Sequence, residues 1–290
     1  MQGGFTEEVC KAALKKKGRC QDMLLAGYMV PHPPIAVPEI GRGEEKKIQA
    51  TIDSFTAVAE DIAALAPETI ILTSPHSVMY RDYFHISPGK GAKGSFAQFR
   101  AADVRFDVEY DEELAQAIAG EADKVGFPAG TLGERDPKLD HGTMVPLYFI
   151  DKMFRDYRLI RIGLSGLSLE DHWKFGQLIR KAVDASGRRC VFVGSGDLSH
   201  CQKEDGPYGY RPEGPVYDEK IMDVMGRGAF DELTGFDEEL LDRSMECGHR
   251  SFTIMGGAFQ GTEIETRQLS HEATFGVGYG FCIYHPKGEN

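Results

Sequence analysis

Short apolar runs alternate with longer amphipathic segments along most of the chain. The apolar runs are rich in β-branched and aromatic residues, which is typical of buried strands. On this basis strands are predicted over 24–30, 69–73, 106–110, 158–163, 190–193, 263–270 and 274–284. Apolar residues at three- and four-residue spacing predict helices over 41–66, 112–125, 144–154, 169–185, 217–226, 237–247 and 251–261. The glycine-rich stretch 90–99 is interpreted as a surface excursion.

The alternation of strands and helices predicts one α/β domain, a three-layer α/β/α sandwich. Two strands follow each other directly at the end of the chain, so the central sheet is expected to be mixed rather than purely parallel. We assign this domain to residues 23–286. Residues 1–22 are polar, carry Lys15–Lys17 and lack an apolar segment, and are interpreted as a peripheral or disordered extension.

Composition excludes several classes of partner. The 290 residues carry a net charge of −12 and show no basic stripe, which argues against nucleic acid. No apolar run is long enough to cross a membrane. The six cysteines are scattered without a CxxC pair, which favours free thiols and a cytoplasmic protein. A homo-oligomer remains open.

Four histidines each follow a turn at the edge of a predicted core element. His32 and His76 come directly after apolar strands and a proline, His200 follows the strand over 190–193, and His141 precedes a helix. Ligands of open α/β sheets bind at the carboxyl ends of the strands, where these loops converge. Neutral imidazole is a good ligand for iron, zinc or copper, so the sequence predicts a metal site.

The third metal ligand has two candidates, Glu246 and Cys247. Adjacent helical residues point about 100° apart, so only one of them is expected to reach the ion. Glu246 with two histidines gives a facial triad suited to non-heme Fe(II) and oxygen chemistry. Cys247 with two histidines is a softer set that favours zinc or copper. The sequence contains no GxSxG elbow, Walker loop, Rossmann fingerprint or HExxH motif that would indicate other chemistry.

Five ordered motifs carry a family resemblance. They are MVPHPP at 29–34, SPH at 74–76, LDHG at 139–142, GSGDLSH at 194–200 and ECG at 246–248. Together they resemble class III extradiol ring-cleavage dioxygenases of the protocatechuate 4,5-dioxygenase beta-subunit type. They are also similar to the related Memo proteins, which present a cysteine in the third-ligand region.

The resemblance implies roles for these residues. His32, His76 and Glu246 match the ligands of Fe(II), with Cys247 as the alternative ligand. His200 matches the acid/base histidine, and His141 a histidine near substrate and oxygen. Further candidates for substrate contact are Pro33, Asp197, Tyr210 and Arg250.

Two functions follow as expectations. The first is an oxidoreductase that cleaves the ring of a catechol-type aromatic diol with O2 and Fe(II). The alternative is a Memo-like protein that binds a metal or a peptide in the same pocket without ring cleavage.

Overall fold

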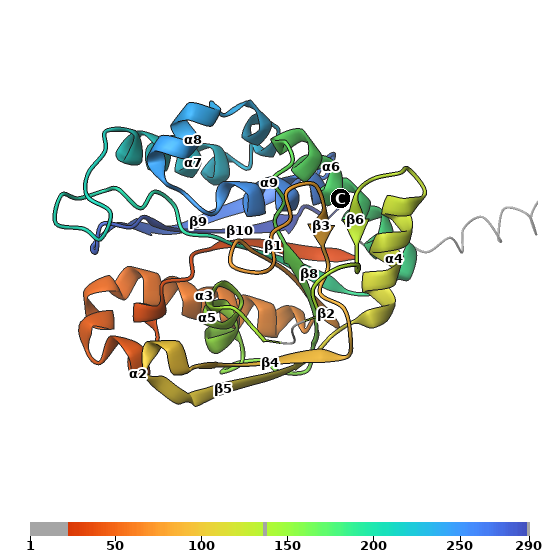
Figure 1. The fold of residues 1–290 in the computed structure, drawn as a ribbon, viewed down its shortest axis with the longest axis horizontal. Helices are drawn as coiled ribbons and strands as arrows, with labels where there is room; N and C mark the ends of the chain where they lie inside the picture. Colours follow the sequence, from red (N-terminus) through yellow and green to blue (C-terminus); the bar gives the residue numbers. More distant parts are fainter. Residues whose placement is uncertain (1–22, 136–137, 289–290) are drawn as a thin grey trace, which may run out of the picture.

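A computed structural model describes residues 23–135 and 138–288 (Figure 1). The predicted extension over 1–22 lies outside the described residues. None of the described helices is both long and apolar enough to span a membrane.

A six-stranded mixed sheet forms the centre of the molecule. Its strand order is β7 (Arg158–Gly163), β2 (Thr69–Ser74), β8 (Cys190–Ser195), β1 (Leu24–Val30), β10 (Tyr279–Pro286) and β9 (Ile264–Glu272). The first four strands are parallel, and β10 pairs antiparallel with both β1 and β9. The mixed sheet predicted from the sequence is therefore confirmed.

Helices cover both faces of this sheet, as the three-layer prediction requires (Figure 1). On one face lie α3 (Gln49–Leu65) and α5 (His141–Ile150). On the other lie α4 (Glu112–Asp123), α6 (Leu169–Ser186), α7 (Glu213–Arg227), α8 (Glu238–Ser244) and α9 (His249–Ala258). Each face has its own apolar cluster, because side chains alternate across a strand.

The short elements connect these layers. They are α2 (Pro38–Gly41), β3 (Phe84–His85), β6 (Ala129–Gly130) and the 3-10 turns η1 (Pro34–Ala36), η2 (Glu44–Ile48), η3 (Ala97–Phe99) and η4 (Phe230–Gly235). The helix predicted over 41–66 starts only at Gln49. α2 ends at Gly41, Arg42 and Gly43 take left-handed conformations with φ of 51° and 106°, and η2 precedes α3.

The interpretation of 90–99 as a surface excursion was wrong. Its residues form β4 (Gly91–Phe96), which pairs antiparallel with β5 (Ala101–Glu109) in a separate hairpin. The glycines that suggested a loop serve close packing instead. A Cβ on Gly91 would lie 2.2 Å from the Val108 carbonyl oxygen, and one on Gly94 would lie 2.5 Å from the Met144 sulfur.

The helix predicted over 237–247 ends three residues early. α8 stops at Ser244, and Met245 takes a left-handed conformation with a φ of 56°. The chain therefore turns sharply before Glu246 and Cys247, and α9 begins at His249. The orientation of these two candidate ligands is set by this turn rather than by a helix.

Candidate metal centre

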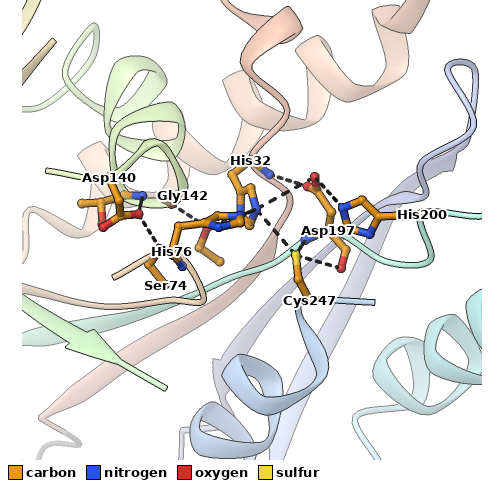
Figure 2. A network of polar contacts seen from close by, with 10 residues as sticks. His32, Ser74, His76, Asp140, Gly142, Asp197, His200 and Cys247 are labelled. Atoms are coloured by element: carbon orange, nitrogen blue, oxygen red, sulfur yellow. Dashed lines mark hydrogen bonds and ion pairs between the residues drawn. The ribbon is translucent and has the colours of Figure 1, made fainter. Parts of the chain in front are cut away.

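Two histidines and a cysteine meet beyond the carboxyl ends of β1 and β2. His32 follows β1, His76 follows β2, and Cys247 lies in the turn between α8 and α9 (Figure 2). Their donor atoms all lie within 4.8 Å of one another. The His32 Nε2 atom is 3.0 Å from His76 Nε2 and 3.6 Å from Cys247 Sγ. Ligand atoms of a tetrahedral zinc ion lie roughly 3.3–3.6 Å apart, so the two distances from His32 Nε2 are close to those around a single ion.

The tautomer of His32 is fixed by Ser195 at the end of β8. The Ser195 hydroxyl donates to the Gly142 carbonyl oxygen at 2.6 Å, so its oxygen must accept from His32 Nδ1 at 3.0 Å. The proton on Nδ1 leaves Nε2 as a free lone pair directed at the centre. The Gly142 carbonyl is available because Pro146, four residues later in α5, has no N–H to donate to it.

His76 is held by the first turn of α5. Its backbone N–H donates to Ser74 Oγ, and the Ser74 hydroxyl donates to Asp140 Oδ1 at 2.6 Å. Asp140 also caps α5 by accepting from the Thr143 backbone N–H. A Cβ on Gly142 would lie 2.4 Å from Ser74 Oγ, so only glycine lets the helix start approach this loop.

Cys247 is docked against the loop after β8 by backbone contacts. The Asp197 N–H donates to Cys247 Sγ at 3.3 Å, and the Cys247 N–H donates to the Asp197 carbonyl oxygen at 3.3 Å. The two loops can approach because a Cβ on Gly196 would lie only 2.0 Å from Gly248 Cα. Asp197 Oδ1 also accepts from the His32 N–H at 2.7 Å. One buried aspartate thus connects the loops that carry two of the three donors.

The structure does not bring Glu246 to the two histidines. The Glu246 carboxylate accepts from the His249 N–H at 2.6 Å at the start of α9. It lines a separate cavity of about 820 Å³, together with Arg250 and residues before α6. Burial raises the pKa of Glu246 to about 7. Adjacent residues of the sharp turn therefore face opposite sides, and Cys247 is the one that faces the histidines.

His141 and His200 surround the donor set. The His141 ring stacks on His76 with centroids 4.0 Å apart, and lies edge-on to His32 at 5.5 Å. His200 Nε2 is 4.0 Å from Asp197 Oδ2, and the His200 ring is edge-on to Tyr208. His200 Nδ1 is buried and has no hydrogen-bond partner among the described residues. All four histidines predicted to converge are thus found around one centre.

The predicted substrate contacts are dispersed. Pro33 is buried beside His32, and Asp197 is buried between His32 and His200. Tyr210 is 49% exposed on the loop that follows His200. Arg250 lines the cavity of Glu246, which is bounded by none of the four histidines.

Desolvation favours the neutral form of three of these histidines. Desolvation, reinforced by the charge of neighbouring His76, places the pKa of His32 well below its ordinary value. Partial desolvation of its ring also lowers the pKa of His76, and burial lowers that of His141 to about 4. The pKa of Asp197 is raised by burial to about 6. Neutral imidazoles at pH 7 are the form that binds metal.

Sequence reasoning missed the supporting residues Ser195, Ser74 and Asp140. Asp140 carries a usable signal, since it directly precedes a helix and aspartate is a favoured N-cap. Ser195 and Ser74 end buried strands, and their partners come from distant parts of the chain.

Comparisons with known proteins bear on the family and the fold. The chain is 40% identical over 269 residues to Protein CA_C1420 of Clostridium acetobutylicum, covering 87% of this chain and 56% of that protein's length. It is 24% identical to 3,4-dihydroxyphenylacetate 2,3-dioxygenase of Escherichia coli, over 80% of this chain and 88% of that one. A MEMO1 family protein of Methanosarcina barkeri is 29% identical over 99 residues, 33% of this chain and 34% of that one.

A solved structure supports the fold alone. The uncharacterized protein JW3007 from Escherichia coli K12 superposes with a TM-score of 0.60 at 13% identity, covering 90% of this chain and 99% of that one.

The family model described as the catalytic LigB subunit of aromatic ring-opening dioxygenase matches residues 26–282. The resemblance predicted from the five motifs is confirmed, and this chain belongs to the LigB family.

Proposed function

We propose that this chain is a metal-binding protein that holds zinc or copper through His32, His76 and Cys247, and presents the ion to a ligand without cleaving an aromatic ring. One observation carries the proposal: the Cys247 thiol, and not the Glu246 carboxylate, lies within reach of both histidines. A donor set of two imidazoles and one thiolate suits zinc or copper, whereas a carboxylate in third place would suit Fe(II).

The protein contributes a preorganised set of donors. His32 is oriented by Ser195, and Cys247 by the Asp197 backbone. Burial raises the pKa of the Cys247 thiol well above its ordinary value, so the metal-free site holds a neutral thiol. A bound ion would deprotonate this thiol and act as a Lewis acid toward a further ligand.

The remaining polar groups are placed to contact that further ligand. His76 is exposed and His141 is partly exposed beside it, whereas His32 is only 1% exposed. Neutral His141 can accept or donate a hydrogen bond, and the unpartnered Nδ1 of His200 can do the same. Three protein donors on one side of an ion leave a coordination position open on the other.

Metal stoichiometry tests the proposal, with two substitutions at neighbouring positions as a matched pair. We expect about one zinc or copper ion per chain in the wild type, and loss of most of that metal in Cys247→Ser. Glu246→Gln should retain it, because its side chain faces the other cavity. Retention of metal by Cys247→Ser together with its loss in Glu246→Gln would contradict the assignment.

A second candidate is an Fe(II) extradiol dioxygenase that acts on a catechol-type aromatic diol. The names of two relatives favour this function. One is the 3,4-dihydroxyphenylacetate 2,3-dioxygenase described above. The other is the 2-aminophenol 1,6-dioxygenase beta subunit of Pseudomonas sp, which is 23% identical over 88% of this chain and 92% of that one. His141 and His200 beside the centre are consistent with an acid/base role on such a substrate. This function requires Glu246 to leave the His249 N–H and turn toward the histidines.

Oxygen uptake separates the two functions. Protein loaded with Fe(II) under anaerobic conditions is mixed with a panel of catechols and oxygen. The metal-binding proposal predicts no catechol-dependent uptake and no yellow ring-opened product. Catechol-dependent uptake that requires iron and His200 would establish the dioxygenase instead.

A further inference from the structure

A cleft of about 1010 Å³ adjoins the metal centre on the side of His76 and His141, both of which line it. Clefts of this size are typical of small-molecule sites. Because His76 is one of the proposed metal ligands, a molecule in the cleft can contact an ion held there. Cys247 and the buried His32 are not part of the lining, so the cleft is the open approach to one face of the centre.

The wall of the cleft opposite the metal centre is formed by the β4–β5 hairpin, which packs against α5, the helix that carries His141 (Figure 1). A Cβ on Gly94 of β4 would meet the Met144 sulfur at 2.5 Å and Leu139 Cβ at 2.9 Å. The Leu139 N–H also donates to the Lys93 carbonyl oxygen at 2.9 Å. The hairpin is thus fixed relative to the centre, and its side chains are presented at a defined place.

The lining of the cleft carries more cationic than anionic side chains, although the protein is acidic. Lys93, Arg105 and Lys138 line the cleft against two carboxylates, Asp107 and Asp140, in a chain of net charge −12. Asp140 is already engaged by Ser74 and Thr143. The cleft therefore concentrates positive charge beside the metal centre.

Two of these cations are available to a ligand. Lys93 pairs with Asp107 at 2.6 Å, but the two side chains are 78% and 69% exposed, so the pair is weak and readily exchanged. Arg105 donates from Nε to the Ala102 carbonyl oxygen and, within the described part of the chain, forms no salt bridge with a carboxylate. A guanidinium without a carboxylate partner can bind a carboxylate or phosphate through two parallel hydrogen bonds.

The cleft also has an apolar component close to the centre. Leu139, Met144 and Phe106 line it, and the Phe99 ring lies edge-on to His141 at 5.6 Å. A flat apolar body can lie against these side chains while an anionic group reaches the hairpin.

From this arrangement we infer that the ligand of the metal centre is a small anion, a carboxylate or phosphate ester with an apolar body, whose charged group is held by Arg105 and Lys93. This inference rests on the proposed function in placing the ligand at the metal, but the cationic wall is a property of the hairpin itself. Calorimetric titration is the test, with catechol, 3,4-dihydroxybenzoate and phenyl phosphate as probes of the metal-loaded protein. The 3,4-dihydroxybenzoate or phenyl phosphate, or both, should bind about tenfold or more tightly than neutral catechol.

Substitutions in the wall of the cleft test which side chains hold the anionic group. Arg105→Gln and Lys93→Gln should each remove most of the preference for the anion while leaving catechol affinity and metal content unchanged, and Arg105→Lys should restore part of it. Lys124→Gln, a change at an exposed lysine after α4, should leave the preference intact. The preference should also weaken as salt is raised, because the contacts are ionic. The relative affinities for 3,4-dihydroxybenzoate and phenyl phosphate show whether the anionic group of the ligand is a carboxylate or a phosphate.

Failure of the inference can be told from failure of the metal site. Benzoate and phenyl phosphate are titrated into chelator-treated protein, where binding that depends on Arg105 reports the wall without any ion. If no metal binds but this dependence remains, the proposed function fails and the anion-binding cleft stands. Equal affinity for catechol and both anions, or a preference unaffected by Arg105→Gln and Lys93→Gln, would overturn the inference.

Discussion

Gly196 controls how closely Cys247 approaches the histidines, and its replacement by alanine offers a quantitative test. The added Cβ would lie 2.0 Å from Gly248 Cα and 2.9 Å from Gly248 N. An ordinary contact between carbon atoms is about 3.5–4.0 Å, so the two loops must separate by roughly 1.5 Å. Backbone atoms lie on both sides of the clash, so no side-chain rotation can relieve it.

This separation acts on the metal donors directly. It breaks the two 3.3 Å hydrogen bonds between Asp197 and Cys247, one to the thiol sulfur and one between backbone groups. It also displaces the thiol by far more than the ±0.2 Å that a metal–ligand distance tolerates. We expect Gly196→Ala to weaken metal binding by at least 10–100-fold, the typical effect of disturbing the residues that orient ligands. The overpacked contact should also lower the free energy of unfolding by about 1–3 kcal/mol.

Competition with a chelator of known affinity measures the first effect, and chemical denaturation of the metal-free protein measures the second. Gly120→Ala in α4 is the matched control, since a Cβ there meets nothing within 4 Å. It should leave metal affinity unchanged and stabilise the helix by about 0.5–1 kcal/mol. Wild-type metal affinity in Gly196→Ala would refute the role given to the Cys247 turn.

Three further predictions concern protons and orientation. Ser195→Ala removes the acceptor that fixes the His32 tautomer and should weaken metal binding about 10–100-fold. The same chelator competition measures this effect, and an unchanged affinity would contradict the tautomer assigned to His32. Metal binding at pH 7 should release about one proton per ion, from the Cys247 thiol alone, because His32 and His76 are already neutral. Calorimetry in buffers of different ionisation enthalpy measures the number of protons released. Release of no proton would argue against a thiolate ligand. The lowered pKa values of His32 and His76 mean that these two residues bind more protons in the unfolded chain below about pH 6.5, so they destabilise the metal-free protein as the pH falls below that value. The raised pKa values of Asp197 and Glu246 act in the opposite direction over this range, so the histidine contribution is isolated by comparing the wild type with His76→Ala. Denaturation of both proteins at a series of pH values checks this, and the same pH dependence in the two would contradict it.

Local patterns in the sequence were sufficient for the central sheet and for the convergence of the histidines. The buried strands of the parallel part are continuous apolar runs, and the loops after them necessarily meet at one edge of the sheet. The second strand of the β4–β5 hairpin was predicted in part, over 106–110, but β4 was not, because Gly91 and Gly94 indicate a loop unless their close neighbours Val108 and Met144 are known. The pairing that forms this side of the cleft was therefore not predictable from the sequence.

The third donor could not be chosen from the sequence for a different reason. The choice between Glu246 and Cys247 depends on the left-handed conformation of Met245, which ends α8. Methionine has no intrinsic preference for positive φ, so no local signal predicts this turn. The tertiary contact between Gly196 and Gly248 then determines which side chain faces the histidines.

The absorption spectrum of the protein reconstituted with Cu(II) or Co(II) tests whether Cys247 binds the ion. A thiolate ligand gives an intense charge-transfer band that nitrogen and oxygen ligands do not give. We predict this band in the wild type and in Glu246→Gln, and its absence in Cys247→Ser. A loaded wild-type protein without the band would place the ion on other donors and contradict the account.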